Sequence, residues 1–365
     1  MLCCDGSGQV KFDYAFFQRD YFVLKVTPMQ FLRSICSQFL VVLVAALPFA
    51  AAAQPPTMKA IVLHESGGPE VLKYEDAPRP QPKDDDILIR VIAAGVNPVD
   101  VFIREGRITR FPFIPGMDVA GVVEQAGNNV TKFKRGDAVY AYLSFEEQGG
   151  YAEFAVANQD HAALKPRSID FEKAAAVPLA ATTAWQALVE KAGLSAGQTV
   201  LIHGGSGGVG TFAVQIAKAR GAKVIATAST ANQDLLKQLG VDQPIDYTTT
   251  KFEDVVKDVD VVLNAVRGDT LARSYTVVKK GGIIVSITGQ PDPGELEKHG
   301  IRGSGLSAHP DAKVLEELAK LIDAGKITPI VSAVKPLVDV AKAQEQIASR
   351  HTRGKIVLKI AEPPK

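Results

Sequence analysis

Apolar and polar residues follow two different rhythms along this chain of 365 residues. From about residue 58 to residue 177, short apolar runs are separated by glycine and proline, which is typical of β-strands joined by turns. From residue 178 onward, apolar runs of strand length alternate with stretches in which apolar residues recur at helical spacing. The first rhythm predicts a mostly β domain. The second predicts a doubly wound α/β domain with a parallel sheet.

In the second region, the expected elements follow one another at the spacing of βαβ units. Strands are expected at 199–203, 223–228, 259–264 and 282–288, and helices at 208–220, 232–239, 270–278 and 311–324. In the first region, strands are expected at 59–63, 87–94, 116–126 and 137–143. The closing stretch 354–358 has the character of the first region, so we expect the chain to return to the β domain.

The first 57 residues resemble neither region and form a predicted N-terminal extension. Between about residues 29 and 53, a basic residue, an apolar run and a small-residue cleavage pattern follow one another, as in a secretory signal peptide. The apolar run is shorter than the roughly 20 residues that cross a bilayer, so no stable membrane span is expected. We expect a periplasmic or secreted protein if the signal is used, and a cytoplasmic protein otherwise.

A glycine-rich loop joins the strand at 199–203 to the helix that follows. Its sequence, Gly205-Ser206-Gly207-Gly208-Val209-Gly210, contains the spacing Gly-x-Gly-x-x-Gly. At a strand-to-helix turn, these glycines permit a tight turn, a close approach to a pyrophosphate and close packing of helix on strand. The helix N-terminus adds free N–H groups and the positive end of its dipole. The loop is therefore expected to bind a dinucleotide.

Charge and cysteine content narrow the possible partners. The formal net charge is +1, which gives no electrostatic reason to expect nucleic acid as a partner. All three cysteines lie within the first 36 residues, so the rest of the chain has no thiolate for a metal site or a disulfide. The expected partner is a small-molecule substrate.

Six short motifs stand at 95–100, 115–123, 149–154, 177–184, 205–210 and 354–358. In sequence and order they resemble the medium-chain dehydrogenase/reductase superfamily, and within it the zinc-independent quinone oxidoreductase branch that includes zeta-crystallin. The resemblance implies a GroES-like β domain at 58–177 and 309–365 and a Rossmann domain at 178–308. It also implies a homodimer, and hydride transfer to a quinone or an α,β-unsaturated carbonyl.

The zinc-ligand positions of the related alcohol dehydrogenases hold other residue types. By the same resemblance, Asn97 and Leu179 stand where those enzymes have cysteine ligands. Met117 and Asp118 replace a His-Glu pair. Because a catalytic zinc needs about three protein ligands, Asp118 alone cannot hold it, and no metal is expected.

The segment after the second strand of the α/β domain bears on the choice between NADH and NADPH. NAD-specific sites place a carboxylate there to bind the ribose 2′-hydroxyl. This chain has Ser229 and Thr230 instead, which can donate hydrogen bonds to a phosphate. By resemblance, Tyr247 and Arg350 match residues beside the 2′-phosphate, so NADP is the expected cofactor. A simple turn at Ser229 and Thr230, and a partly buried aromatic at Tyr247, are the alternatives.

Four further residues are expected to contact the cofactor. Val266, Thr288 and Gly289 follow later strands of the sheet, at the end where the nicotinamide should rest. Lys355 lies in the closing motif and is the fourth.

Three polar residues are the expected catalytic groups. Without a metal, hydrogen bonds must stabilise the oxygen on which charge develops. Asn97 can donate one from its amide and Asp100 could anchor that site, with a turn residue and a helix cap as the alternatives. Thr183 resembles a family threonine near the nicotinamide, with a hydroxyl at a helix start as its alternative. Phe102 replaces a tyrosine that several relatives use near the substrate, so the proton donor stays open.

Two functions of different classes remain open on the sequence. The first is an NADPH-dependent quinone or enone reductase that needs no metal. The second is a nucleotide-binding protein of the same fold with a structural or sensing role and little turnover. Asn97 and Thr183 favour the enzyme, whereas Phe102 favours the second reading.

Overall fold

The computed structural model describes residues 56–363, apart from residues 146 and 148. The predicted signal peptide at 29–53 lies outside the described residues. Within the described range, no helix combines the length and the apolar character needed to cross a membrane.

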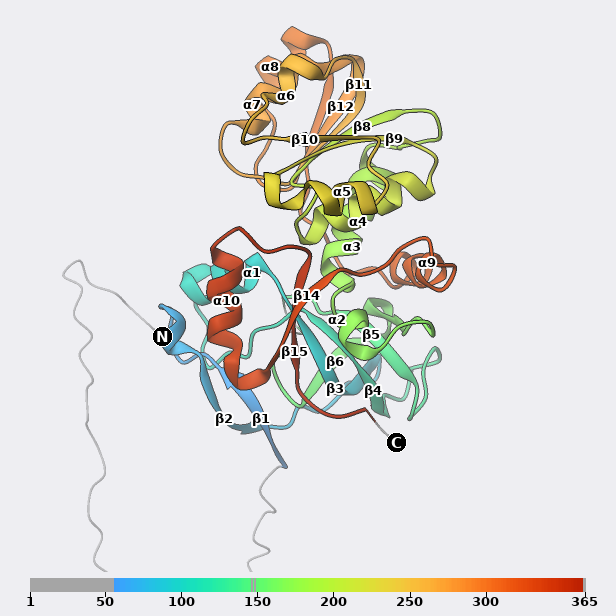
Figure 1. The fold of residues 1–365 in the computed structure, drawn as a ribbon. Coiled ribbons are helices and arrows are strands. Elements are labelled where there is room, and N and C mark those ends of the chain that lie inside the picture. The colour runs from blue at the N-terminus through green and yellow to red at the C-terminus, as the bar shows by residue number, and fades with distance from the viewer. Residues whose placement is uncertain (1–55, 146, 148, 364–365) are drawn as a thin grey trace, which may run out of the picture. The chain divides into compact units, whose positions relative to one another are not determined.

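The α/β region forms a parallel sheet with helices on both faces (Figure 1). Its strands lie in the order β10-β9-β8-β11-β12-β13, and each neighbouring pair is parallel. They are β8 (Thr199–His203), β9 (Lys223–Ala228), β10 (Gln243–Asp246), β11 (Val259–Asn264), β12 (Val278–Ser286) and β13 (Arg302–Gly305). The strand order reverses beside β8, which is where a doubly wound sheet binds its ligand.

Strand β8 contributes apolar side chains to the buried clusters on both faces of the sheet, because alternate residues of a strand point to opposite faces. Val200 and Ile202 pack in one buried cluster with Phe212 of α4, whereas Leu201 packs in the opposite cluster with Phe252 of α6. The helices are α4 (Gly208–Ala219), α5 (Gln233–Gln238), α6 (Phe252–Val255), α7 (Thr270–Ser274) and α8 (Pro293–His299). A sheet covered on both faces explains the nearly continuous apolar runs of its strands.

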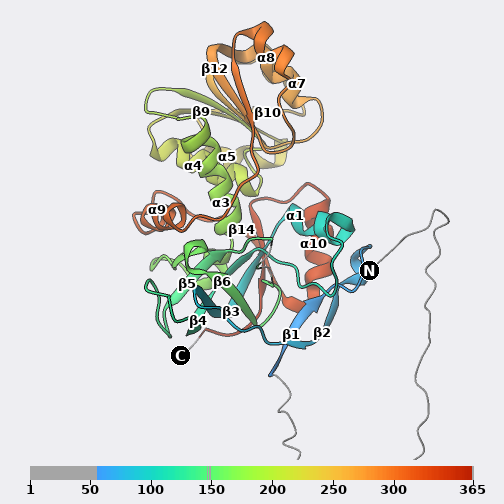
Figure 2. The same ribbon diagram turned by 180° about the vertical axis from the view of Figure 1, so that it is seen from behind.

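The remaining strands build mostly antiparallel sheets (Figure 2). The larger sheet has the order β14-β15-β3-β4-β5-β7, with β6 paired to β3, and β1 pairs with β2. The strands are β1 (Thr57–Val62), β2 (Lys73–Pro78), β3 (Asp86–Val96), β4 (Asp118–Ala126), β5 (Ala138–Tyr142), β6 (Phe154–Asn158), β7 (Ala162–Leu164), β14 (Val331–Pro336) and β15 (Lys355–Lys359). Ile356 of β15 lies opposite Val96 of β3, so the predicted return of the chain to this sheet is confirmed.

The other helices connect or cover these sheets. They are α1 (Pro98–Phe102), α2 (Phe171–Ala175), α3 (Pro178–Trp185), α9 (Ala312–Asp323) and α10 (Val340–Ala348). Shorter 3₁₀ or π turns lie at 69–71, 103–107, 159–161, 186–191, 230–232, 275–277 and 337–339. Leu315 and Leu318 of α9 share the buried cluster that contains α4 and β8.

The structure confirms the predicted fold class and corrects the ends of two elements. The strand expected at 282–288 starts at Val278 and ends at Ser286, so Thr288 and Gly289 lie in the loop after it. The helix expected at 270–278 ends at Ser274, because a 3₁₀ turn and then β12 follow. Strand β13 was not predicted, since its sequence Arg-Gly-Ser-Gly has no apolar residue.

Candidate active site

The glycine loop is closely packed at some positions and open at another. Gly205 N donates to the Thr227 carbonyl at 2.9 Å, and Gly207 N donates to the Gly204 carbonyl at 3.0 Å. A Cβ at Gly210 would lie 2.0 Å from the Gly204 oxygen, so only glycine fits there. A Cβ at Gly207 would meet nothing closer than 3.4 Å. The loop therefore leaves room at Gly207, the N-cap of α4, for an anion such as a pyrophosphate.

The closing strand of the β domain begins against this loop. Gly354 N donates to the Ser206 carbonyl at 2.8 Å. A Cβ at Gly208 would lie 3.2 Å from Cδ of Lys355, so the lysine stem runs along the start of α4. Val209 packs partly buried against the core around α4. The loop is thus held by contacts from both regions of the fold.

The structure brings two of the residues expected at the nicotinamide end together. Asn264 Nδ2 donates to the Val266 carbonyl at 3.1 Å and lies 2.9 Å from the Thr288 hydroxyl, which also donates to Val266. A Cβ at Gly204 would lie 2.8 Å from Val266, so this loop borders the glycine loop. A Cβ at Gly289 would meet no atom within 4 Å. The open space at Gly289, like that at Gly207, fits an extended dinucleotide along this edge.

The hydroxyls expected near the 2′-phosphate lie at the adjoining ends of β9 and β10. Ser229 Oγ accepts from Asn232 Nδ2 at 3.1 Å, which leaves its own hydrogen available to a ligand. Thr230 shares a hydrogen bond of 2.9 Å with Thr248. Tyr247 is 61% exposed, so the alternative of a partly buried aromatic does not describe it.

Two charged residues, Arg350 and Asp246, bear on the expected binding of the 2′-phosphate. Arg350 is exposed and lies just beyond α10, in a left-handed conformation with φ of 61°. In the described part of the chain, no hydrogen bond or ion pair joins its guanidinium to the hydroxyls at the end of β9. The Asp246 carboxylate accepts from the Thr248 hydroxyl at 2.6 Å, so an acidic group also lies beside these hydroxyls.

A lysine cation lies among the residues that, by the family resemblance, stand at the zinc-ligand positions. Lys355 Nζ donates to Oδ1 of Asn97 and lies 3.0 Å from Oδ2 of Asp118. Asn97 Nδ2 donates to the same Asp118 oxygen at 2.9 Å. Because an ammonium only donates and a carboxylate only accepts, these partners fix the orientation of the Asn97 amide. The other Asp118 oxygen accepts from Leu179 N at 2.6 Å.

Asp100 adjoins this cluster and both caps a helix and holds a tyrosine. Its Oδ2 accepts from Asn97 N at 2.8 Å, at the start of α1, and from the Tyr151 hydroxyl at 2.7 Å. Its Oδ1 is buried without a hydrogen-bond partner. Burial raises the pKa of Asp100 to about 7, although the Tyr151 hydrogen bond acts in the opposite direction. Tyr151 was missed on the sequence, where it stood only as part of a family motif.

Thr183 lies within α3 and not at its start. Its hydroxyl donates to the Leu179 carbonyl at 2.7 Å, so its oxygen can only accept from a further partner. Phe102 is 38% exposed, and the Arg267 guanidinium lies 4.8 Å from its ring centre. Arg267 follows Val266 in the loop after β11, and Phe102 is the last residue of α1. The loop after β11 therefore contacts α1 directly.

Two family models match the chain. The alcohol dehydrogenase GroES-like domain matches residues 83–167, and the zinc-binding dehydrogenase domain matches residues 239–358. The parallel sheet, the glycine loop and these matches define a nucleotide-binding dehydrogenase.

Individual relatives show which kind of nucleotide-binding dehydrogenase this chain resembles. A quinone oxidoreductase of Sus scrofa is 37% identical over 82% of this chain and 97% of its own length. An NADPH-dependent alkenal/one oxidoreductase of Arabidopsis thaliana, a chloroplastic protein, is 38% identical over 83% of this chain and 80% of its own length. The solved structure of a Coxiella burnetii quinone oxidoreductase superposes with a TM-score of 0.78, at 34% identity over 84% of this chain and 100% of that one. This chain therefore belongs to the medium-chain dehydrogenase/reductase superfamily, in its quinone oxidoreductase branch, and it is an oxidoreductase.

Proposed function

We propose that this protein transfers a hydride from NADPH to a quinone or to an α,β-unsaturated carbonyl, and that it needs no metal. The observation that carries the proposal is the buried cluster of Asn97, Lys355 and Asp118 beside the glycine loop. The stem of Lys355 lies beside Gly208, so the cluster adjoins the loop that we expect to bind the nucleotide. The names of the relatives from pig and Arabidopsis support this substrate class.

The donor set of the cluster supports catalysis without zinc. It consists of one carboxylate, one amide and an ammonium, and the ammonium opposes the approach of a second cation to Asp118. Among the described residues, no three His, Cys, Asp or Glu side chains are grouped to hold a metal ion.

The preference for NADPH rests on the end of β9. Ser229 offers a free hydroxyl hydrogen there, and Tyr247 presents an exposed ring beside it in the pairing of β9 with β10. The Arabidopsis relative is named as NADPH-dependent, which supports the same cofactor.

The chain's own residues supply orientation, and one of them can hold a proton. Bound NADPH would supply the hydride. Asn97 Nδ2 has a second hydrogen beyond the one donated to Asp118, and it can stabilise a developing oxyanion. Thr183 can accept a hydrogen bond from a bound ring or sugar. Asp100 can hold a proton on its unpartnered Oδ1 near neutral pH, since its pKa is about 7.

A cofactor-oxidation panel tests the proposal. Purified protein with a chelator present is given NADPH or NADH and a set of quinones and enones, and loss of nicotinamide absorbance is followed. We expect acceptor-dependent oxidation that is faster with NADPH and insensitive to the chelator. Activity that the chelator abolishes and zinc restores would contradict the metal-free mechanism.

Assembly and location are further parts of the proposal. We propose a homodimer, which the family resemblance and the position of β13 at the edge of its sheet support. Light scattering of the purified protein tests it. We also propose export by the signal at 29–53, which cell fractionation and N-terminal sequencing of the mature protein would test.

A further inference from the structure

Four buried polar residues lie side by side across the parallel sheet, three at the last residue of a strand and one, Thr227, next to the last. Thr227 pairs with His203, His203 pairs with Asn264, and Asn264 pairs with Ser286. None is more than 4% exposed. Because paired residues of parallel strands point to the same face, these side chains form a continuous row. We call Thr227, His203, Asn264 and Ser286 the polar row.

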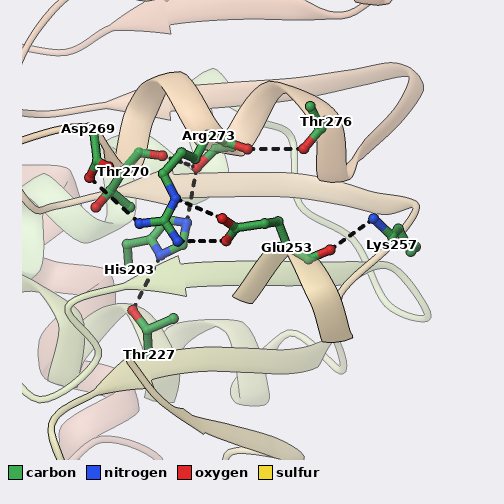
Figure 3. Close-up of polar contacts among 9 residues, drawn as sticks. His203, Thr227, Glu253, Lys257, Asp269, Thr270, Arg273 and Thr276 are labelled. Atoms are coloured by element: carbon green, nitrogen blue, oxygen red, sulfur yellow. Dashed lines mark hydrogen bonds and ion pairs between the residues drawn. The ribbon is translucent and has the colours of Figure 1, made fainter. Parts of the chain in front are cut away.

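One half of the polar row, formed by Thr227 and His203, holds the glycine loop. Figure 3 shows these two side chains and the bond between them. Gly204 N donates to the Thr227 hydroxyl at 3.3 Å, and that hydroxyl lies 3.3 Å from Nδ1 of His203. His203 Nε2 lies 3.1 Å from the Ser274 hydroxyl, which donates to the Thr270 carbonyl at 2.6 Å. Since Ser274 uses its hydrogen on that carbonyl, it accepts from Nε2. The lone pair of Nδ1 then accepts the Thr227 hydrogen.

His203 acts in this chain of bonds as a neutral group. Burial, together with the nearby Arg273 cation, lowers the pKa of His203 to about 3. Arg273 is itself held by Glu253 through bonds of 2.9 and 2.7 Å (Figure 3), and the Phe252 ring lies 4.5 Å from the imidazole. The imidazole therefore keeps one tautomer throughout the physiological pH range.

The other half of the polar row holds the loops expected at the nicotinamide end. Asn264 Nδ2 donates to the Val266 carbonyl, and it also contacts the Thr288 and Ser286 hydroxyls at 2.9 and 3.2 Å. Thr288 N donates to the Ser286 hydroxyl at 3.4 Å. Thr227, Asn264 and Ser286 therefore bond directly to loop atoms, whereas His203 reaches the glycine loop through the Thr227 hydroxyl.

We propose that the polar row positions the loops that bind the pyrophosphate and the nicotinamide end of the dinucleotide, so that Thr227, His203 and Asn264 are positioning residues for the cofactor. This inference rests on the proposed function in assuming a nicotinamide dinucleotide at these loops. An apolar core would serve packing equally well, since burying polar groups costs free energy unless each finds a partner. Hydrogen bonds from the polar row to loop atoms, in contrast to apolar packing, determine where those loops lie.

Matched variants separate this role from simple packing. Thr227→Val, His203→Phe and Asn264→Leu each remove one tether while keeping an apolar volume in place. Val262→Ala is the control, because Val262 is a buried β11 residue on the same face whose apolar side chain makes no hydrogen bond to these loops. Dissociation constants for NADPH and NADH are measured by nicotinamide fluorescence, melting temperatures by calorimetry, and amide hydrogen exchange of the loops without nucleotide.

We expect each row variant to raise the dinucleotide Kd about tenfold, the equivalent of one or two lost hydrogen bonds. Exchange at residues 204–210 or 265–269 should quicken in the row variants and stay unchanged in Val262→Ala. Row variants that bind within about twofold of wild type, with a lowered melting temperature like the control, would overturn the proposal. If wild type binds neither nucleotide, the proposed function fails. The exchange comparison then still decides whether the row holds the loops.

Discussion

The Lys355 ammonium lies 3.0 Å from the Asp118 carboxylate, and neither side chain is more than 3% exposed. A buried ion pair of this kind is costly to break, because removal of one partner leaves an uncompensated charge in the interior. Asn97 bonds to both members, so the pair also fixes the amide that we place beside the substrate.

Replacement of Lys355 by methionine tests this relationship. The free energy of unfolding of Lys355→Met should fall by about 3–5 kcal/mol, measured by urea denaturation. The double variant Lys355→Met/Asp118→Leu removes both charges and should recover much of that stability. Its kcat should stay low, because Asn97 loses the partners that orient it. Full activity in the double variant would show that the pair serves stability alone.

Asp100 should give the protein a characteristic dependence of stability on pH. Burial raises the pKa of its carboxyl from 3.8 to about 7, so between these values the folded protein binds a proton that the unfolded chain has lost. The Asp100 contribution to the free energy of unfolding should therefore fall as pH rises from about 4 to 7, by on the order of 4 kcal/mol, and then level off.

The difference between wild type and Asp100→Asn isolates this contribution, because the amide cannot ionise. Tyr151→Phe removes a hydrogen bond that lowers the pKa of Asp100 in the folded protein, so it should extend the upper end of the window to higher pH. If the free energies of unfolding of wild type and Asp100→Asn changed with pH in the same way across this range, Asp100 would be ionised in the folded protein, which contradicts the prediction.

Two glycines of the same loop should respond differently to alanine. Gly207 has an extended backbone with φ of −80°, and a methyl group there would make only an ordinary contact of 3.4 Å with the Gly204 oxygen. Gly207→Ala should keep the stability of wild type within about 1 kcal/mol but raise the dinucleotide Kd at least about tenfold, as the methyl fills the phosphate cradle. Gly210→Ala should lose about 1–3 kcal/mol of stability or more, since its Cβ would lie 2.0 Å from a carbonyl oxygen. Unchanged nucleotide binding in Gly207→Ala would place the pyrophosphate elsewhere.

Cofactor preference should change with one charge at the end of β9. Ser229→Asp introduces the carboxylate that NAD-specific sites carry and would repel a 2′-phosphate. The ratio of kcat/KM for NADPH over NADH should fall at least about tenfold. Ser229→Asn, similar in size but uncharged, is the control and should change the ratio far less. If both variants lowered the ratio equally, the shape of the new side chain and not its charge would explain the change in cofactor preference.

The sequence predicted the parts of this molecule that depend on local patterns. The strand, the glycine loop and helix α4 occupy adjacent positions, so spacing alone places Gly205 to Gly210 correctly. Strand β10 was missed because it is four residues long and contains Pro244. The sequence showed no sign of its pairing with β9, which brings Tyr247 next to Ser229.

The cluster and the polar row depend on relationships that no local pattern contains. Lys355 meets Asn97 across 258 positions of sequence, so its cation could be assigned to the cofactor but not to the zinc-ligand positions. His203 ends an apolar strand, and only the register of β8 with β9 and β11 shows that its neighbours are polar as well. Sheet register and long-range contacts are set by the whole core.

Hydride transfer to carbon tests the central proposal most directly. The purified protein is incubated with an α,β-unsaturated ketone and NADPH that carries deuterium at the transferred position of the nicotinamide, and the product is analysed by NMR. The account predicts a saturated ketone with deuterium at its β-carbon, in equal yield with and without a chelator. Product without deuterium at that carbon, or no oxidation of NADPH by folded protein with any enone or quinone, would contradict it.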